Sequence, residues 1–183
     1  LDTPDFVLEE LIVDTEAILL EPILSFPSVG GITDKDNHHF GATALVSTTG
    51  RQEIQNLDLA ISIEVPGSGF EPLDLWDRDN NRYVREFRSV PLVPDEPNSI
   101  HCDVRIPEAT RSRLEQAVRS GTDTFTLRVE TNKVAGYSEW EFGVQRLDRD
   151  DDVIDVEVVC VLPAPPSQGV IDWRESFEKK WTN

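Results

Sequence analysis

Three short stretches contain residue types that could bind a metal ion. Residues 77–81 (Asp-Arg-Asp-Asn-Asn) match the first ligand positions of an EF-hand calcium loop, and residues 34–38 (Asp-Lys-Asp-Asn-His) start in the same way. An EF-hand needs glycine at its sixth position, where these stretches have Arg82 and His39, so neither qualifies. The acidic loop 148–152 could hold calcium or another cation more loosely, or it could simply be solvated. We therefore predict no resident cofactor or metal.

Histidine and cysteine are the other residues that could carry catalysis. His38 precedes His39, and His101 precedes Cys102. Neighbouring side chains on a strand point to opposite faces, so the two histidines cannot easily share a metal and His101 cannot easily activate Cys102. The sequence also has no nucleophile elbow, phosphate loop or zinc-protease motif. Cys102 and Cys160 lie in apolar strand patterns, which favours two buried thiols over a disulfide. We predict that the protein is not an enzyme.

The stretch 56–65 shows which elements position these residues. Its apolar residues fall at every second position, which predicts a strand with one face on a core: Leu57, Leu59, Ile61, Ile63 and Val65. Similar runs occur at 40–47, 83–90, 100–106, 123–130, 139–146 and 153–162. We predict an all-β fold, a single β-sandwich or jelly-roll barrel of about eight antiparallel strands. The order of the strands cannot be read from the sequence.

Local signals add connections and one helix. We expect hairpins between 40–47 and 56–65 and, across Gly136, between 125–129 and 140–144. Pro107 suits the start of a helix and Gly121 its end, so the sequence predicts one short internal helix between them.

The charge balance limits the possible partners. The 183 residues include 35 acidic and 17 basic side chains, and the net charge is −18 with a pI of about 4.4. Such a charge repels nucleic acid, so we predict no nucleic-acid binding. Acidic, lysine-poor surfaces are typical of proteins from extreme halophiles, although an ordinary acidic protein from a GC-rich genome would also fit. No apolar run approaches the ~20 residues of a membrane helix, so we predict no membrane insertion.

The C-terminal segment differs from the rest of the chain. We predict a β domain over 1–162, followed by a proline-rich linker and an amphipathic helical arm over 163–183. Trp173, Phe177 and Trp181 are spaced four residues apart, which places them on one helical face. This face could pack on its own domain or on a neighbouring subunit. Trp173, Phe177 and Trp181 are our candidate interface residues.

In outline the chain resembles the single jelly-roll major capsid proteins of icosahedral viruses of halophilic archaea. The resemblance covers the whole chain and rests on its size, its acidic composition, the strand runs 40–47 to 153–162 and the arm 163–183. It implies a virion shell in which the chain contacts copies of itself and related shell subunits, without catalysis. The alternative is an immunoglobulin-like or stress-type β-sandwich that acts as a binding module, inside a halophile or at its cell surface.

Overall fold

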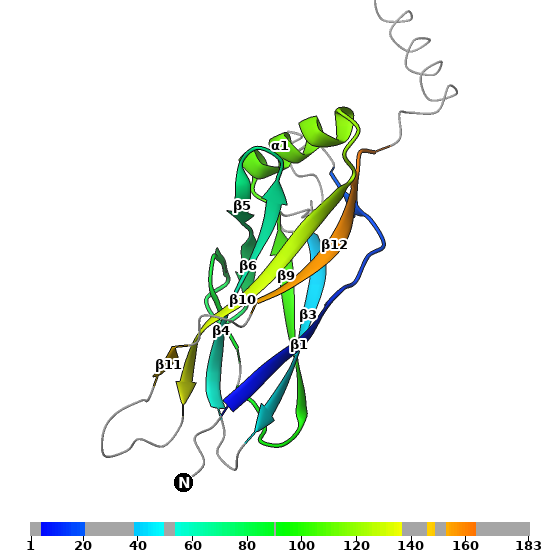
Figure 1. Ribbon diagram of the computed structural model, residues 1–183. Helices are drawn as coiled ribbons and strands as arrows, with labels where there is room; N and C mark the ends of the chain where they lie inside the picture. Colours follow the sequence, from blue (N-terminus) through cyan, green and yellow to red (C-terminus); the bar gives the residue numbers. More distant parts are fainter. Residues whose placement is uncertain are drawn as a thin grey trace, which may run out of the picture.

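The described part of the chain forms two β-sheets and one helix (Figure 1). The computed structural model describes residues 5–20, 39–49, 54–89, 91–136, 146–148 and 153–163. The first sheet has the strand order β1 (Asp5–Val13), β3 (His39–Thr49), β9 (Pro97–Arg105), β6 (Asp74–Asp77) and β7 (Arg82–Val84). The second has the order β2 (Ile18–Leu19), β12 (Val153–Val161), β10 (Thr124–Gly136), β4 (Ile54–Val65) and β5 (Gly69–Pro72). Two further strands join it, since β11 (Arg146–Asp148) pairs with β10 and β8 (Phe87–Arg88) pairs with β4. The prediction of an all-β fold is confirmed.

One hydrophobic core joins the inner faces of the two sheets. The alternating residues of β4 are all buried, as predicted: Leu57, Leu59, Ile61, Ile63 and Val65. The same alternation buries Ile100, Cys102 and Val104 of β9, which belongs to the other sheet. These side chains belong to one cluster, so the two sheets form a β-sandwich.

The strand order is that of an immunoglobulin sandwich. The run β1-β3-β9-β6 faces the run β12-β10-β4-β5, and in chain order these correspond to strands A-B-E-D and G-F-C-C′. The paired strands of the described residues run antiparallel, except that β2 runs parallel to β12, with Ile18 opposite Cys160. The jelly-roll order is not confirmed.

One predicted connection and one predicted strand are wrong. The runs 40–47 and 56–65 do not form a hairpin, because β3 and β4 lie in opposite sheets. Both strands have one apolar face, and a pair of facing sheets buries such faces as well as a hairpin does. The run 83–90 is not one strand, because its first part (β7) pairs with β6 and its second part (β8) pairs with β4 across the sandwich. The predicted hairpin partner 140–144 lies outside the described residues.

A β-bulge shapes the first strand. Phe6 and Leu8 are buried, and then Leu11 is buried although it has the opposite parity. The pairing of β1 with β3 shifts register between Leu8 and Glu10, which explains the change of parity. Because the bulge interrupts the alternation of apolar residues, the sequence pattern of this segment does not distinguish a strand from a short helix.

The predicted helix is confirmed as α1 (Glu108–Arg119). Pro107 precedes its first residue, and Gly121 after its end has a φ of 106°, a conformation that glycine adopts readily. Leu114 is fully buried beneath the helix. Arg113 also forms a two-pronged ion pair with Glu71 of β5, in which its Nε lies 2.8 Å from Oε2, and this contact attaches α1 to the second sheet.

The three aromatic residues of the predicted C-terminal arm, Trp173, Phe177 and Trp181, lie outside the described residues, as do most of the acidic loop 148–152 and the stretch 34–38. The arm and its interface therefore stay predictions. Within the described residues, no helix is long and apolar enough to cross a membrane.

Candidate functional site

A cleft of about 270 Å³ opens where β6 separates from β9. The two strands pair only through Asp74–Arg105 and Leu75–Val104, and beyond these pairs β6 turns away toward β7. We call this space the β6–β9 cleft. Three segments line it: residues 76–79 at the end of β6 and in the turn after it, Phe87 and Arg88 of β8, and residues 99–101 and 103 of β9.

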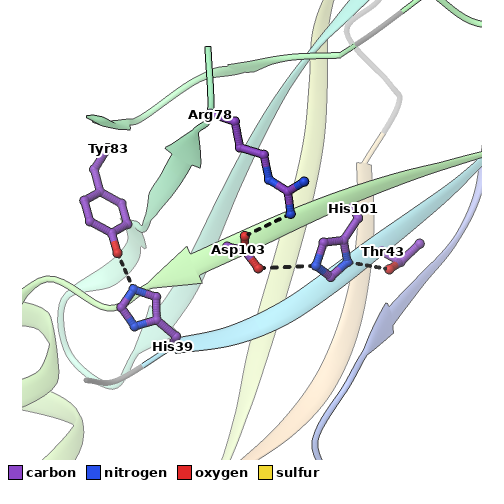
Figure 2. Close-up of polar contacts among 6 residues, drawn as sticks. All are labelled: His39, Thr43, Arg78, Tyr83, His101 and Asp103. Carbon is purple, nitrogen blue, oxygen red and sulfur yellow. Dashed lines mark hydrogen bonds and ion pairs between the residues drawn. The ribbon is translucent and has the colours of Figure 1, made fainter. Parts of the chain in front are cut away.

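His101 and Asp103, on the outward face of β9, line the cleft, and Figure 2 shows their polar contacts. His101 is hydrogen-bonded through Nδ1 to the Thr43 hydroxyl at 3.2 Å and through Nε2 to Asp103 Oδ1 at 3.3 Å. Arg78, on the turn after β6, approaches the other oxygen of Asp103 at 3.9 Å. This ion pair is largely exposed and therefore weak, so Arg78 and Asp103 remain available to other polar groups.

His101 stands close to the backbone of the neighbouring strand because Gly41 lies beside it. A Cβ atom added to Gly41 would lie 2.8 Å from His101 Cε1 and would also overlap the Asp14 carboxylate. Glycine at this position therefore lets His101 and Asp14 approach each other. The imidazole thus contacts Asp103 and, like the Asp14 carboxylate, lies close to Gly41.

An aromatic and cationic cluster borders the cleft on the β7 side. The rings of Trp76 and Tyr83 pack edge to face, with their centres 4.9 Å apart. The Arg105 guanidinium covers the Tyr83 ring at 3.6 Å, and the Tyr83 hydroxyl is hydrogen-bonded to His39 (Figure 2). Arg105 also pairs with Asp74 at 3.1 Å. These contacts fix the orientation of the Trp76 ring, which lines the cleft.

The stretch that resembled a calcium loop is a hairpin turn. Asp77 Oδ1 accepts hydrogen bonds from the backbone N–H groups of Asp79 and Asn80, at 3.1 and 3.4 Å, and Oδ2 accepts one from the Asn80 side chain at 2.7 Å. The Asn80 hydrogen bond is the main cause that lowers the pKa of Asp77. Asn81 completes the turn with a φ of 52°. Among the described residues no cluster of His, Cys, Asp and Glu could hold a metal ion.

The two cysteines belong to the core. Cys102 and Cys160 are free thiols, and both are buried. Desolvation by burial raises the pKa of each thiol to about 12. Cys102 points into the core, while His101 is exposed on the opposite face of β9. The prediction that these two side chains point to opposite faces of their strand is confirmed. Buried thiols with such pKa values are not nucleophiles at neutral pH.

Sequence reasoning identified part of this site. It predicted a strand over 100–106, whose alternation implies that His101, Asp103 and Arg105 share its outer face, as they do in the structure. Sequence reasoning missed the cleft, because Trp76 and Phe87 lie in short apolar stretches that cannot be distinguished from ordinary strand fragments. Only the divergence of β6 from β9 brings these residues together, and strand divergence has no signature in a single sequence.

Comparison with known proteins shows only distant likenesses. No family model and no curated protein matches the chain. The CARDB domain of a Pyrococcus furiosus protein, solved with di-metal ions, has 10% identity and a TM-score of 0.40, over 89% of this chain and 98% of that domain. A domain of a candidate cell-surface protein from Methanosarcina acetivorans has 11% identity and a TM-score of 0.40, over 87% and 94%. A protein from Arabidopsis thaliana has 9% identity and a TM-score of 0.42, over 90% and 85%. At these scores the likenesses carry no argument about function.

Proposed function

We propose that the chain is a non-enzymatic binding module that holds its ligand in the β6–β9 cleft. The observation that carries the proposal is the cleft itself, because it joins aromatic and charged side chains from three separate segments. Trp76 and Phe87 offer ring surfaces, while Arg78, His101 and Asp103 offer hydrogen-bonding groups of both kinds. A concave surface with a few polar groups beside aromatic ones is the usual form of a ligand site.

Two further features support binding rather than catalysis. The cysteines, which would be the strongest nucleophiles, are buried in the core. The immunoglobulin strand order is a scaffold that commonly presents binding surfaces, although a fold alone does not determine function.

The test is a binding screen with a matched pair of variants. Methyl glycosides, disaccharides, amino-acid amides and dicarboxylates are added at millimolar concentration to the purified chain, and binding is measured by calorimetry. We expect at least one class to bind, and Trp76→Ala to abolish that binding. Phe70→Ala is the control, because this aromatic residue lies on the second sheet and does not line the cleft. The Arg128 guanidinium lies 3.8 Å from the centre of the Phe70 ring. Equal binding by both variants, or no binding by the original chain, would refute the proposal.

Self-assembly is the second candidate function. It is favoured by the spacing of Trp173, Phe177 and Trp181, which would place three aromatic rings on one face of a helix. In this proposal the chain is a shell subunit of a virion from a halophilic host, as the resemblance to capsid proteins implies. The strand order supports the binding module instead, because the capsid family implies a jelly roll and the observed order is that of an immunoglobulin sandwich. The oligomeric state with and without residues 163–183 separates the two proposals.

A further inference from the structure

The inner wall of the β6–β9 cleft is a strand edge. β3 pairs with β9 along its whole length, from His39–Arg105 to Ser47–Pro97. On the other side of β9, β6 pairs only with Val104 and Arg105. Within the described residues, no strand pairs with β9 on this side between Pro97 and Asp103.

The pairing pattern shows which backbone groups this edge presents. The N–H of Asp14 donates to the carbonyl of Gly41 at 3.0 Å, so the backbone groups of Gly41 point toward β1. In an antiparallel ladder successive residues bond to alternate sides. The even-numbered residues of β3 therefore bond to β9, and the odd-numbered residues of β9 present their backbone groups to the opposite side.

Ser99, His101 and Asp103 consequently present their backbone N–H and C=O groups to the cleft, and all three line it. The edge from Ser99 to Asp103 is roughly 15 Å long at the usual rise of a strand. That length fits about five residues of an extended chain. Exposed strand edges of this kind bind extended peptides, which add a strand to the sheet.

We propose that the cleft receives an extended basic segment of a partner protein, which pairs with β9 as an additional strand. This inference rests on the proposed function and specifies the ligand class. The partner's backbone would bond to Ser99, His101 and Asp103. Its alternate side chains would point outward, toward Trp76 and Asp103, and inward, toward Phe87.

Charge complementarity favours a basic segment. The chain has a net charge of −18, which attracts cationic partners over long distances at low salt. Asp77, Asp79 and Asp103 line the cleft itself, against Arg78 and Arg88. A lysine on the outward face of the added strand would lie between the Asp103 carboxylate and the Trp76 ring, where it gains both an ion pair and a cation–π contact.

The other long edge strand of the same sheet is protected against such pairing. β1 is bulged at Leu8–Glu10, and its exposed residues include Glu9 and Glu10. Bulges and charges are common ways to block an edge. The open part of β9 has no bulge, since its register with β3 is continuous. The contrast singles out β9 as the edge that can accept a strand.

The test uses a defined probe, an acetylated and amidated heptapeptide of alternating lysine and valine. Two further versions carry N-methyl groups on the lysines only or on the valines only, so each removes the backbone donors from one edge of the peptide. Binding to the full chain is measured by calorimetry at low salt. We expect the unmodified peptide to bind with a Kd of about 1 mM or tighter. One N-methylated version should bind about tenfold or more weakly than the unmodified peptide, and the other should bind with the same affinity.

A matched pair of variants places the contact on β9. Ser99→Pro removes one N–H that faces the cleft without removing a bond to β3, whereas Ser99→Val keeps that N–H. We expect peptide binding to fall in Ser99→Pro and to persist in Ser99→Val, with both variants folded by circular dichroism. If Ser99→Pro does not fold, the pair of N-methylated peptides alone decides the test.

Three results would overturn the inference. The first is no binding of the unmodified peptide, and the second is equal binding of the two N-methylated versions. The third is concentration-dependent dimerisation that Ser99→Pro abolishes, because the occupant of the edge would then be a second copy of the chain. Any of these results overturns the peptide inference. The proposed binding function would still stand if small ligands of the screen bind in a Trp76-dependent way.

Discussion

The two core thiols should make the protein less stable in mildly alkaline solution. Burial raises the pKa of Cys102 and of Cys160 to about 12, from an ordinary value of 9.0. Below pH 9.0 both thiols are protonated in the folded and unfolded states, so they cause no change of stability with pH. Between pH 9.0 and about 12 only the unfolded chain loses these protons, so the free energy of unfolding falls as the pH rises.

The magnitude follows from the two pKa values. At pH 10 each thiol of the unfolded chain is largely ionised, which lowers the free energy of unfolding by about 1.4 kcal/mol per thiol. The two thiols together contribute about 3 kcal/mol, a large part of the stability of an ordinary domain. This loss would be measurable even though tyrosines and lysines also begin to titrate in the same range.

The assay is urea unfolding at several pH values between 8 and about 10, followed by circular dichroism under reducing conditions. The variant Cys102→Ala/Cys160→Ala is the reference, because it keeps every other titrating group. We expect the original chain to lose about 3 kcal/mol more than the variant over this range. Parallel curves for the two proteins would show that the thiols are not buried and would reopen the question of a reactive cysteine.

Three other predictions follow from charge and from the C-terminal segment. Hydrogen bonding from Arg113 lowers the pKa of Glu71. The contact therefore stabilises the fold above the ordinary pKa of 4.5, and this stabilisation is lost as the pH falls. Glu71→Gln should lower the free energy of unfolding by about 1 kcal/mol at pH 7 and flatten the acid side of a pH–stability curve. If the acidic surface is an adaptation to high salt, the melting temperature should rise steeply between about 0.1 M and about 2 M KCl, whereas a flat profile in scanning calorimetry would refute that adaptation. Replacing Trp173, Phe177 and Trp181 together by alanine should leave the domain folded but abolish any oligomers seen by sedimentation velocity; loss of folding without a change in assembly would favour packing on the chain's own domain.

The sequence predicted the elements whose pattern is local. The alternation of β4 and β9 and the helix between Pro107 and Gly121 could be read because each depends on residues a few positions apart. The pairing of these elements could not be read. An apolar face does not specify which sheet it belongs to, so the expected hairpin between 40–47 and 56–65 looked as plausible as the sandwich that forms.

The same limit applies to the candidate site. His101 and Asp103 are two residues apart on one strand, and their shared outer face was predictable. Trp76 and Phe87 reach the cleft from strands of different sheets, because the chain crosses the sandwich between β7 and β8. In the structure the chain bends at residues 85–86 to make this crossing, and the sequence there carries no turn signal. The sequence therefore predicted only one wall of the candidate site, the outer face of β9.

The most direct test of the proposed binding function is chemical-shift mapping by NMR. Backbone amide and tryptophan indole resonances of the full chain are recorded while the ligand classes of the screen are added one at a time. We predict that the binding ligand moves the Trp76 indole resonance and the amides of Ser99, His101 and Asp103, and leaves the second sheet unchanged except near Phe87 and Arg88, which line the cleft. Shifts confined to other surfaces, or no shifts with any class, would contradict the account.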